Sequence, residues 1–199
     1  MKNSRRLGIF ATAAIACAAS LAAAEPPQVD IGAELEKAKR WTTPGANHKE
    51  LERFLGQWDT ESRMMLPTGP TAPEKGTATY SWLMEGRWLK GESSGTMMGF
   101  PIRTFGILGY DNFKMSYVTA NVNSFDTTLT TSEGDMDPSG KAILSYGTLD
   151  EYLTGEHDKM VKYVWRFISA DEMVLEVHDL PIGEKNTQVI EIRFKRRKG

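Results

Sequence analysis

Residues 48–58 read HKELERFLGQW and join a predicted helix directly to a predicted strand. Asn47 is a favourable N-cap with a glutamate three positions later, a capping-box variant that predicts a helix beginning at His48. Gly56 ends this helix, because only glycine enters the left-handed conformation without steric cost. From Trp58 onward the pattern has a period of two, with charged side chains on one face, which predicts a strand that turns Trp58 inward.

The rest of the chain predicts strands separated by turn signals at the spacing of an antiparallel meander. After the first strand, which begins at Gln57, the predicted strands cover residues 75–85, 87–98, 102–110, 114–123, 126–133, 141–150, 159–169, 173–179 and 187–197. A closed barrel removes the exposed edges that a flat sheet of this length would present. We therefore predict an all-β domain over residues 46–199, a single antiparallel β-barrel of about ten strands with a short N-terminal helix closing one end.

A helix that runs through Gly-x-Trp into a first strand resembles the start of lipocalin-like (calycin) barrels, in which the tryptophan plugs the floor. More of the chain resembles the bacterial family called domain of unknown function 1579. The matching segments are His48 to Trp58, Gly86-Arg87-Trp88-Leu89, Gly106 with Gly109-Tyr110-Asp111-Asn112, and Ser132-Glu133-Gly134. This resemblance implies a lipocalin-like barrel and candidate positions, but no activity. The family more usually carries Trp and Asp where this chain has Asn121 and Asn123, so a ligand at these positions would differ between this protein and its relatives.

The amino-terminal segment, residues 1–24, has the organisation of a secretory signal peptide. Basic residues precede an alanine-rich apolar run that is too short for a membrane span, and Ala22-Ala23-Ala24 offers a small-residue cleavage site. Cleavage after Ala24 is favoured over a lipid anchor at Cys17, which would leave a very short apolar region. We expect a periplasmic or secreted protein in which residues 25–45 form a linker with one helical patch over 31–41.

Composition and motif spacing exclude several kinds of chemistry. Removing the three basic residues of the predicted signal peptide leaves 21 basic and 26 acidic residues, a balance that argues against nucleic-acid binding. The one cysteine lies in that signal peptide, so the mature chain has no thiol chemistry. The segment Gly91-Glu92-Ser93-Ser94-Gly95 matches a nucleophile motif but lacks the following helix that the motif needs. The three histidines lack metal-ligand spacing, and the sequence identifies no catalytic residue, metal or cofactor.

Alternation along the strands places aromatic and polar side chains on the inner face, where a filled core would carry Leu, Ile and Val. Buried amides without partners cost roughly 1–3 kcal/mol each, so water or a ligand must satisfy them. We predict a ligand-sized cavity lined by Tyr80, Trp82, Arg87, Tyr117, Asn121 and Asn123. The partner expected for Arg87 is either a carboxylate at the rim or an anionic group of the ligand. Tyr110 and Asp111, at a strand end, complete the predicted ligand-binding set, with an ordinary hairpin turn as the alternative for Asp111.

Four residues have predicted structural roles at the closed end of the barrel. They are His48, Gly56, Trp58 and Arg196. Closing an antiparallel barrel brings the end of the last strand beside the start of the first, so we predict that Arg196, rather than Arg193, stacks on Trp58.

Three functional classes remain open from the sequence. A barrel with a mixed polar and apolar cavity favours binding of a small molecule. The alternatives are an enzyme acting on a small anionic substrate through Arg87, Tyr110, Asp111 and His178, and an envelope interaction protein whose barrel is solid.

Overall fold

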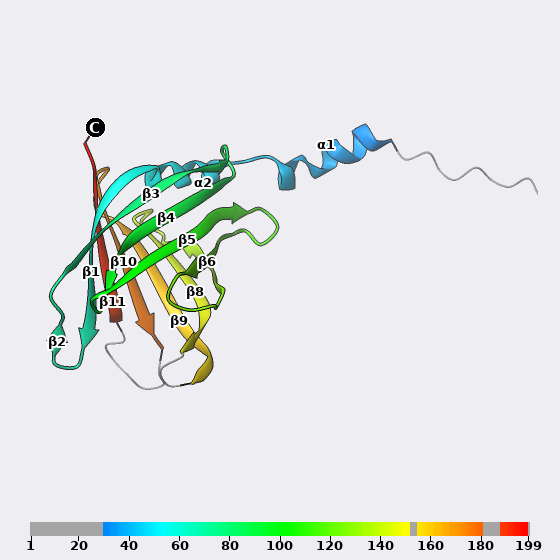
Figure 1. Ribbon diagram of the computed structural model, residues 1–199. Coiled ribbons are helices and arrows are strands. Elements are labelled where there is room, and N and C mark those ends of the chain that lie inside the picture. Colours follow the sequence, from blue (N-terminus) through cyan, green and yellow to red (C-terminus); the bar gives the residue numbers. More distant parts are fainter. Residues whose placement is uncertain (1–29, 152–154, 181–187, 199) are drawn as a thin grey trace, which may run out of the picture. The chain divides into compact units, whose positions relative to one another are not determined.

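The computed structural model describes residues 30–151, 155–180 and 188–198 of the chain (Figure 1). The chain divides into two units, Met1–Lys37 and Ala38–Gly199. Helix α1 (Ile31–Thr42) begins in the first and ends in the second, which confirms the helix predicted over residues 31–41. None of the helices in the described ranges is long and apolar enough to cross a membrane.

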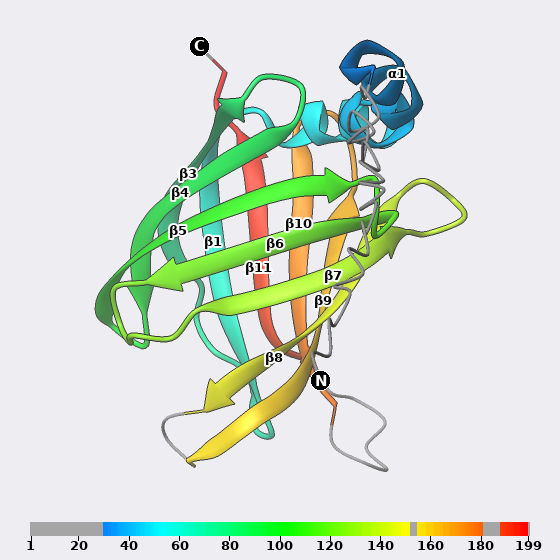
Figure 2. The same cartoon turned by 90° about the vertical axis from the view of Figure 1, so that its right-hand side faces the viewer.

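The second unit is a closed antiparallel barrel of ten strands, which confirms the predicted fold class (Figure 2). Each strand pairs with the next along the chain, and the last pairs with the first to close the barrel; β2 is an extra two-residue strand on β1. The elements are α2 (Ala46–Lys49), the 3₁₀ helix η1 (Glu50–Phe54), β1 (Gly56–Leu66), β2 (Gly69–Pro70), β3 (Glu74–Met84), β4 (Trp88–Met97), β5 (Phe100–Asp111), β6 (Ser116–Asn123), β7 (Thr130–Met136), β8 (Ala142–Glu151), β9 (Glu156–Phe167), β10 (Glu172–Asp179) and β11 (Gln188–Arg196).

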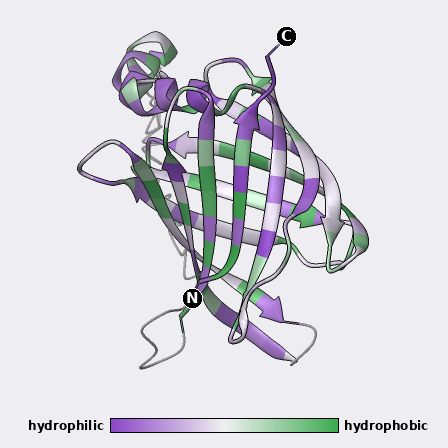
Figure 3. Cartoon of the chain, turned by 90° about the vertical axis from the view of Figure 1, so that its left-hand side faces the viewer, coloured by the Kyte–Doolittle hydropathy of each residue, from purple (hydrophilic) through white to green (hydrophobic). Residues whose placement is uncertain are grey.

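The core lies at the end of the barrel that α2 and η1 cover. Leu51 and Phe54 of η1 are fully buried, and they belong to one apolar cluster with Trp58 and inward-facing residues of the strands. Along the strands, hydrophobic and hydrophilic residues alternate, as Figure 3 shows. The helical segment therefore fills one end of the lumen, and the strands bury one face each.

Helix α2 begins earlier than the sequence predicts. The N-cap is Gly45 rather than Asn47, and the His48 Nδ1 atom accepts a hydrogen bond from the Gly45 N–H at 3.1 Å. The ring of His48 reaches back over the first turn, as a glutamine does at the third position of a capping box. The prediction that Asn47 caps the helix was therefore wrong, because the side chain three positions into the helix supplies the cap.

Gly56 follows η1 with a positive φ of 114°, as the predicted glycine requirement implies. Leu55 has already left the helical conformation, so Gly56 begins β1 and does not itself form the helix cap. A Cβ atom here would lie 2.7 Å from an Arg196 guanidinium nitrogen. The backbone conformation therefore favours glycine, and any larger residue would also displace the end of the Arg196 side chain.

Candidate functional site

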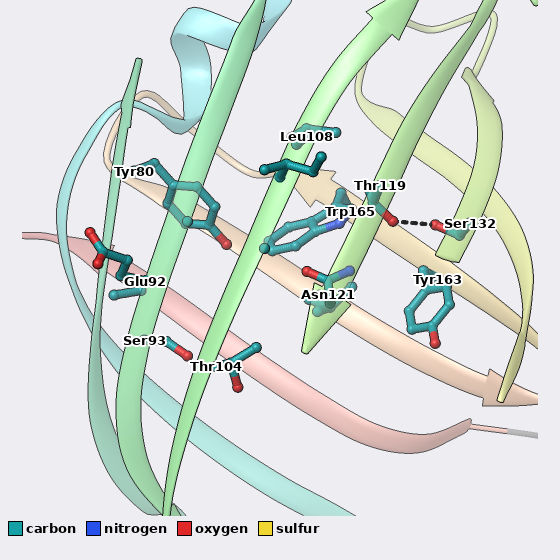
Figure 4. Close-up of a pocket in the computed structure, with 15 residues that line it drawn as sticks. Tyr80, Glu92, Ser93, Thr104, Leu108, Thr119, Asn121, Ser132, Tyr163 and Trp165 are labelled. Atoms are coloured by element: carbon teal, nitrogen blue, oxygen red, sulfur yellow. Dashed lines mark hydrogen bonds between the residues drawn. The ribbon is translucent and has the colours of Figure 1, made fainter. Parts of the chain in front are cut away.

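A cavity of about 120 Å³ lies inside the barrel, beyond the end that the helices fill (Figure 4). Its lining combines apolar, aromatic and uncharged polar residues from seven strands with one acidic residue. They are Ala78, Tyr80, Gly91, Glu92, Ser93, Thr104, Gly106, Ile107, Leu108, Thr119, Asn121, Ser132, Tyr163, Trp165 and Leu175. The volume is below the 300–1,000 Å³ typical of drug-sized pockets and close to the ~150 Å³ of an engineered cavity that holds benzene.

One wall of the cavity is a row of directly paired residues across four strands. Tyr80 of β3 pairs with Gly91 of β4, Gly91 with Gly106 of β5, and Gly106 with Asn121 of β6. A Cβ atom on Gly91 would lie 2.6 Å from the Tyr80 ring, and one on Gly106 would overlap the Asn121 side-chain oxygen. Because the two glycines have no side chain, the Tyr80 ring can lie over Gly91 and the Asn121 amide over Gly106.

The opposite wall comes from the later strands. Trp165 and Tyr163 of β9 and Leu175 of β10 line the cavity. The rings of Trp165 and Tyr80 are nearly perpendicular, at 86°, with centroids 6.3 Å apart. Phe54 of η1 packs on the edge of Trp165 at 5.2 Å, so the helical segment holds the aromatic wall in place.

Polar groups at the cavity fall into two sets. Thr119 and Ser132 share a hydrogen bond of 2.7 Å, and the Ser132 hydroxyl donates to Ser145 at 3.1 Å. By contrast, the Tyr80 and Tyr163 hydroxyls and the Asn121 amide form no hydrogen bond with any described part of the chain. Three groups that need partners therefore face the cavity.

Burial keeps both tyrosines protonated. It raises the pKa of Tyr163 to about 12 and the pKa of Tyr80 still further above its ordinary value. At neutral pH both hydroxyls can therefore donate as well as accept hydrogen bonds.

None of the lining residues points a charged group into the cavity. Glu92 is the one carboxylic acid among them, and its carboxylate points away from the cavity (Figure 4). It pairs with the Lys90 ammonium at 3.0 Å. More than half of the Glu92 side chain is exposed, so it reaches the cavity with its backbone side rather than with its charge.

Arg196, near the carboxyl terminus of the domain, contacts residues near its amino terminus, at the closed end of the barrel. Its guanidinium carbon lies 4.1 Å from the centroid of the Trp58 ring, and Trp58 pairs directly with it in the sheet. The same guanidinium donates to the carbonyls of Arg53, Leu55 and Ala170. The prediction that Arg196 stacks on Trp58 is confirmed, whereas Arg193 lies on the outer face, paired with a neighbouring glutamate.

The sequence matches a family model described as "Protein of unknown function (DUF1579)" over residues 43–196. The chain belongs to this family. No curated protein matches the sequence. The solved structures that share the fold include the two described next. The crystal structure of Rv2717c from M. tuberculosis is 13% identical, with a TM-score of 0.53, covering 77% of this chain and 99% of that one. The S-type phycobiliprotein lyase CPES from Guillardia theta is 10% identical, with a TM-score of 0.50, covering 78% and 99%.

Of the six residues predicted to line a cavity in this DUF1579 barrel, Tyr80 and Asn121 do so. Trp82 packs against the core cluster. Tyr117 is buried under the helical segment, where its hydroxyl donates to the Asn47 carbonyl at 3.2 Å. The prediction that these last two side chains line the cavity was wrong, because Trp82 packs against the core cluster and α2 covers Tyr117.

Two other residues that were predicted to line the cavity instead form hydrogen bonds with backbone groups of neighbouring segments. Arg87 lies in the exposed turn before β4, and its guanidinium donates to the Thr42 carbonyl at 2.6 Å. Asn123, at the end of β6, accepts from the N–H groups of Phe125 and Asp126. This loop also explains why β7 begins at Thr130 rather than at residue 126 as predicted. A strand pattern cannot distinguish an inward-facing side chain from one that folds back on the adjacent turn.

The predicted pair Tyr110 and Asp111 lies at the closed end rather than at the cavity. Tyr110 packs against His48 at 5.6 Å and against Tyr117 at 5.0 Å between ring centroids. The Asp111 carboxylate accepts from the N–H groups of Phe113 and Lys114. The alternative interpretation of Asp111, an ordinary hairpin turn, is therefore the correct one.

The residues considered for an enzyme are not brought together. Arg87 and Asp111 bind backbone groups, and His178 lies on the outer face 3.4 Å from the Glu176 carboxylate. Across the residues that the structure describes, no group of three or more His, Cys, Asp or Glu side chains could hold a metal ion.

Sequence reasoning missed the wall formed by Tyr163, Trp165 and Leu175. Alternation along β9 carries the signal, because Tyr163 and Trp165 share a face with the fully buried Val161, while Lys162 and Arg166 lie on the other. Gly91 and Gly106 carry a second signal, since glycine inside a strand often marks a place where another group approaches closely.

Proposed function

We propose that this protein binds a small molecule in the barrel cavity. The observation that carries the proposal is the set of three inward polar groups, the Tyr80 and Tyr163 hydroxyls and the Asn121 amide, that lack partners in the described structure. These groups line the cavity, where water or a bound molecule must satisfy them, and a chain that only had to fill its core would carry apolar side chains there. A bound molecule supplies the missing partners and explains why the polar groups are present.

The cavity favours this function over an interaction protein with a solid barrel. Aromatic walls from β3 and β9 surround a space of about 120 Å³, and the helical segment fills the other part of the lumen. A solid barrel would place apolar side chains where Gly91 and Gly106 face each other.

Native mass spectrometry tests the proposal on protein purified from its own host. We expect a retained compound that is absent, or reduced at least about tenfold, in the double variant Asn121→Leu/Tyr163→Phe. The matched control is Tyr146→Phe, which removes a tyrosine hydroxyl from the exposed outer face of β8 and leaves the cavity unchanged. A compound retained equally by the double variant would place binding elsewhere on the molecule and contradict the proposal.

We further propose that the protein is exported and that the mature chain begins at Glu25. The support is the sequence of residues 1–24, with its basic start, its apolar alanine-rich run and Ala22-Ala23-Ala24 before Glu25; these residues lie outside the described ranges. Amino-terminal sequencing of the protein from a periplasmic fraction tests this. An acylated amino terminus at Cys17, or an intact Met1 in the cytoplasmic fraction, would contradict it.

A further inference from the structure

The lining of the cavity also indicates the chemistry of its ligand, an inference that rests on the proposed binding function. We propose that the cavity selects an uncharged molecule about the size of a single ring, with one hydrogen-bonding group directed at Asn121. Charge, shape and hydrogen-bonding capacity of the lining each point to this class.

The charge of the lining excludes an ionic ligand. The Glu92 carboxylate is turned to the outer surface, and every other lining residue is uncharged. The inward-facing charges nearer the other end of β9 and β10 already neutralise each other, because the Lys159 ammonium lies 2.9 Å from the Asp179 carboxylate. An ion moved from water into the cavity would lose hydration without meeting an opposite charge, which is far more costly than burying a neutral polar group.

The shape of the cavity favours a flat, compact molecule. Tyr80 and Trp165 present aromatic surfaces at nearly a right angle, so one ring can stack on one surface while its edge meets the other. Leu108 and Leu175 add apolar surface. A volume of about 120 Å³ fits one small ring, whereas an extended lipid or a multi-ring pigment would have to protrude from it.

The hydrogen-bonding capacity is concentrated at Asn121. Its amide offers donors and an acceptor, and the amide lies over Gly106, where no other residue would leave it room. The protonated hydroxyl of Tyr163 also lines the cavity. A ligand hydroxyl or amide at this place would satisfy groups that the described chain leaves without partners.

Three single-ring probes test the class on the full-length mature chain: phenol, benzoate and benzene. Phenol is neutral with one hydroxyl, benzoate is similar in size but charged, and benzene lacks a hydrogen-bonding group. We expect phenol to shift the side-chain amide resonance of Asn121 and the indole resonance of Trp165, with benzoate at least about tenfold weaker. Asn121→Leu should weaken phenol binding about tenfold while benzene binds as well or better, which shows that the cavity is intact.

The outcomes separate this inference from the proposed function. Benzoate binding as tightly as phenol at the same two residues would overturn the uncharged class and leave small-molecule binding in the cavity standing. Unchanged phenol binding in Asn121→Leu would overturn the role of the amide. If no probe shifts either resonance and native mass spectrometry finds no retained compound, both this inference and the proposed function fall.

Discussion

Polar side chains in the two halves of the barrel lumen differ in whether they form hydrogen bonds with the protein. At the end covered by the helices, Arg196, His48 and Tyr117 each bind a backbone group of the helical segment or its flanks. At the cavity, Tyr163 and Asn121 form no hydrogen bond with the described chain. Polar side chains at the helix-covered end stabilise the fold, and those at the cavity are available to a ligand.

The largest effect is expected at Arg196. Arg196→Ala removes the cation-π contact with Trp58 and the donor to three carbonyls, so we expect the free energy of unfolding to fall by about 3 kcal/mol. Arg193→Ala, on the outer face of the same strand, should cost less than about 0.5 kcal/mol. Urea unfolding of both variants measures the difference. An equal loss for the two arginines would show that the closed end does not depend on this contact.

A smaller, pH-dependent effect is expected at His48. Burial and the nearby Arg87 charge lower the pKa of His48 below 6.5, and a hydrogen bond with the Tyr110 backbone opposes this by raising the pKa. The unfolded chain therefore binds a proton more readily than the folded one, so the free energy of unfolding falls as the pH drops through about 6.5. Protonation also removes the Nδ1 acceptor that caps Gly45.

His48→Gln is the matched variant, because glutamine at this position can keep the cap but does not titrate. Denaturant midpoints at pH 7.5, 6.5 and 5.5 should decline more steeply for the natural chain than for His48→Gln. The exposed His157→Gln variant should follow the natural chain. Parallel pH profiles for all three proteins would show that His48 does not contribute.

The smallest effect, and the sharpest comparison, comes from two tyrosines. Tyr117→Phe loses the hydrogen bond to the Asn47 carbonyl and should cost about 1 kcal/mol of unfolding free energy. Tyr163→Phe removes a hydroxyl that has no partner in the described chain, so the ligand-free protein should change by less than about 0.3 kcal/mol. A loss at Tyr163 as large as that at Tyr117 would mean that the cavity hydroxyl stabilises the fold, and the two halves would no longer differ.

The sequence predicted the frame of this molecule better than its cavity. Alternation with a period of two placed Trp58, Asn121 and Arg196 on the inner face, because every strand of a closed barrel has one buried side. It failed for Arg87 and Asn123, since both lie at strand ends, where side chains can bind the backbone of the adjacent turn. The division of the lumen into a filled half and an open half depends on how deep η1 reaches, and no local pattern encodes that depth.

The pairing of β1 with β11 also governs when the barrel can form. The hydrogen bond from Arg196 to the Leu55 carbonyl joins residues 141 positions apart, and β1 has its second neighbour only once β11 has been made. Closing so long a loop is entropically costly and slow, and until then β1 exposes an unpaired edge to other chains. Closure is therefore expected at the end of folding, and a chain that loses its last ten residues should aggregate rather than fold into a smaller barrel.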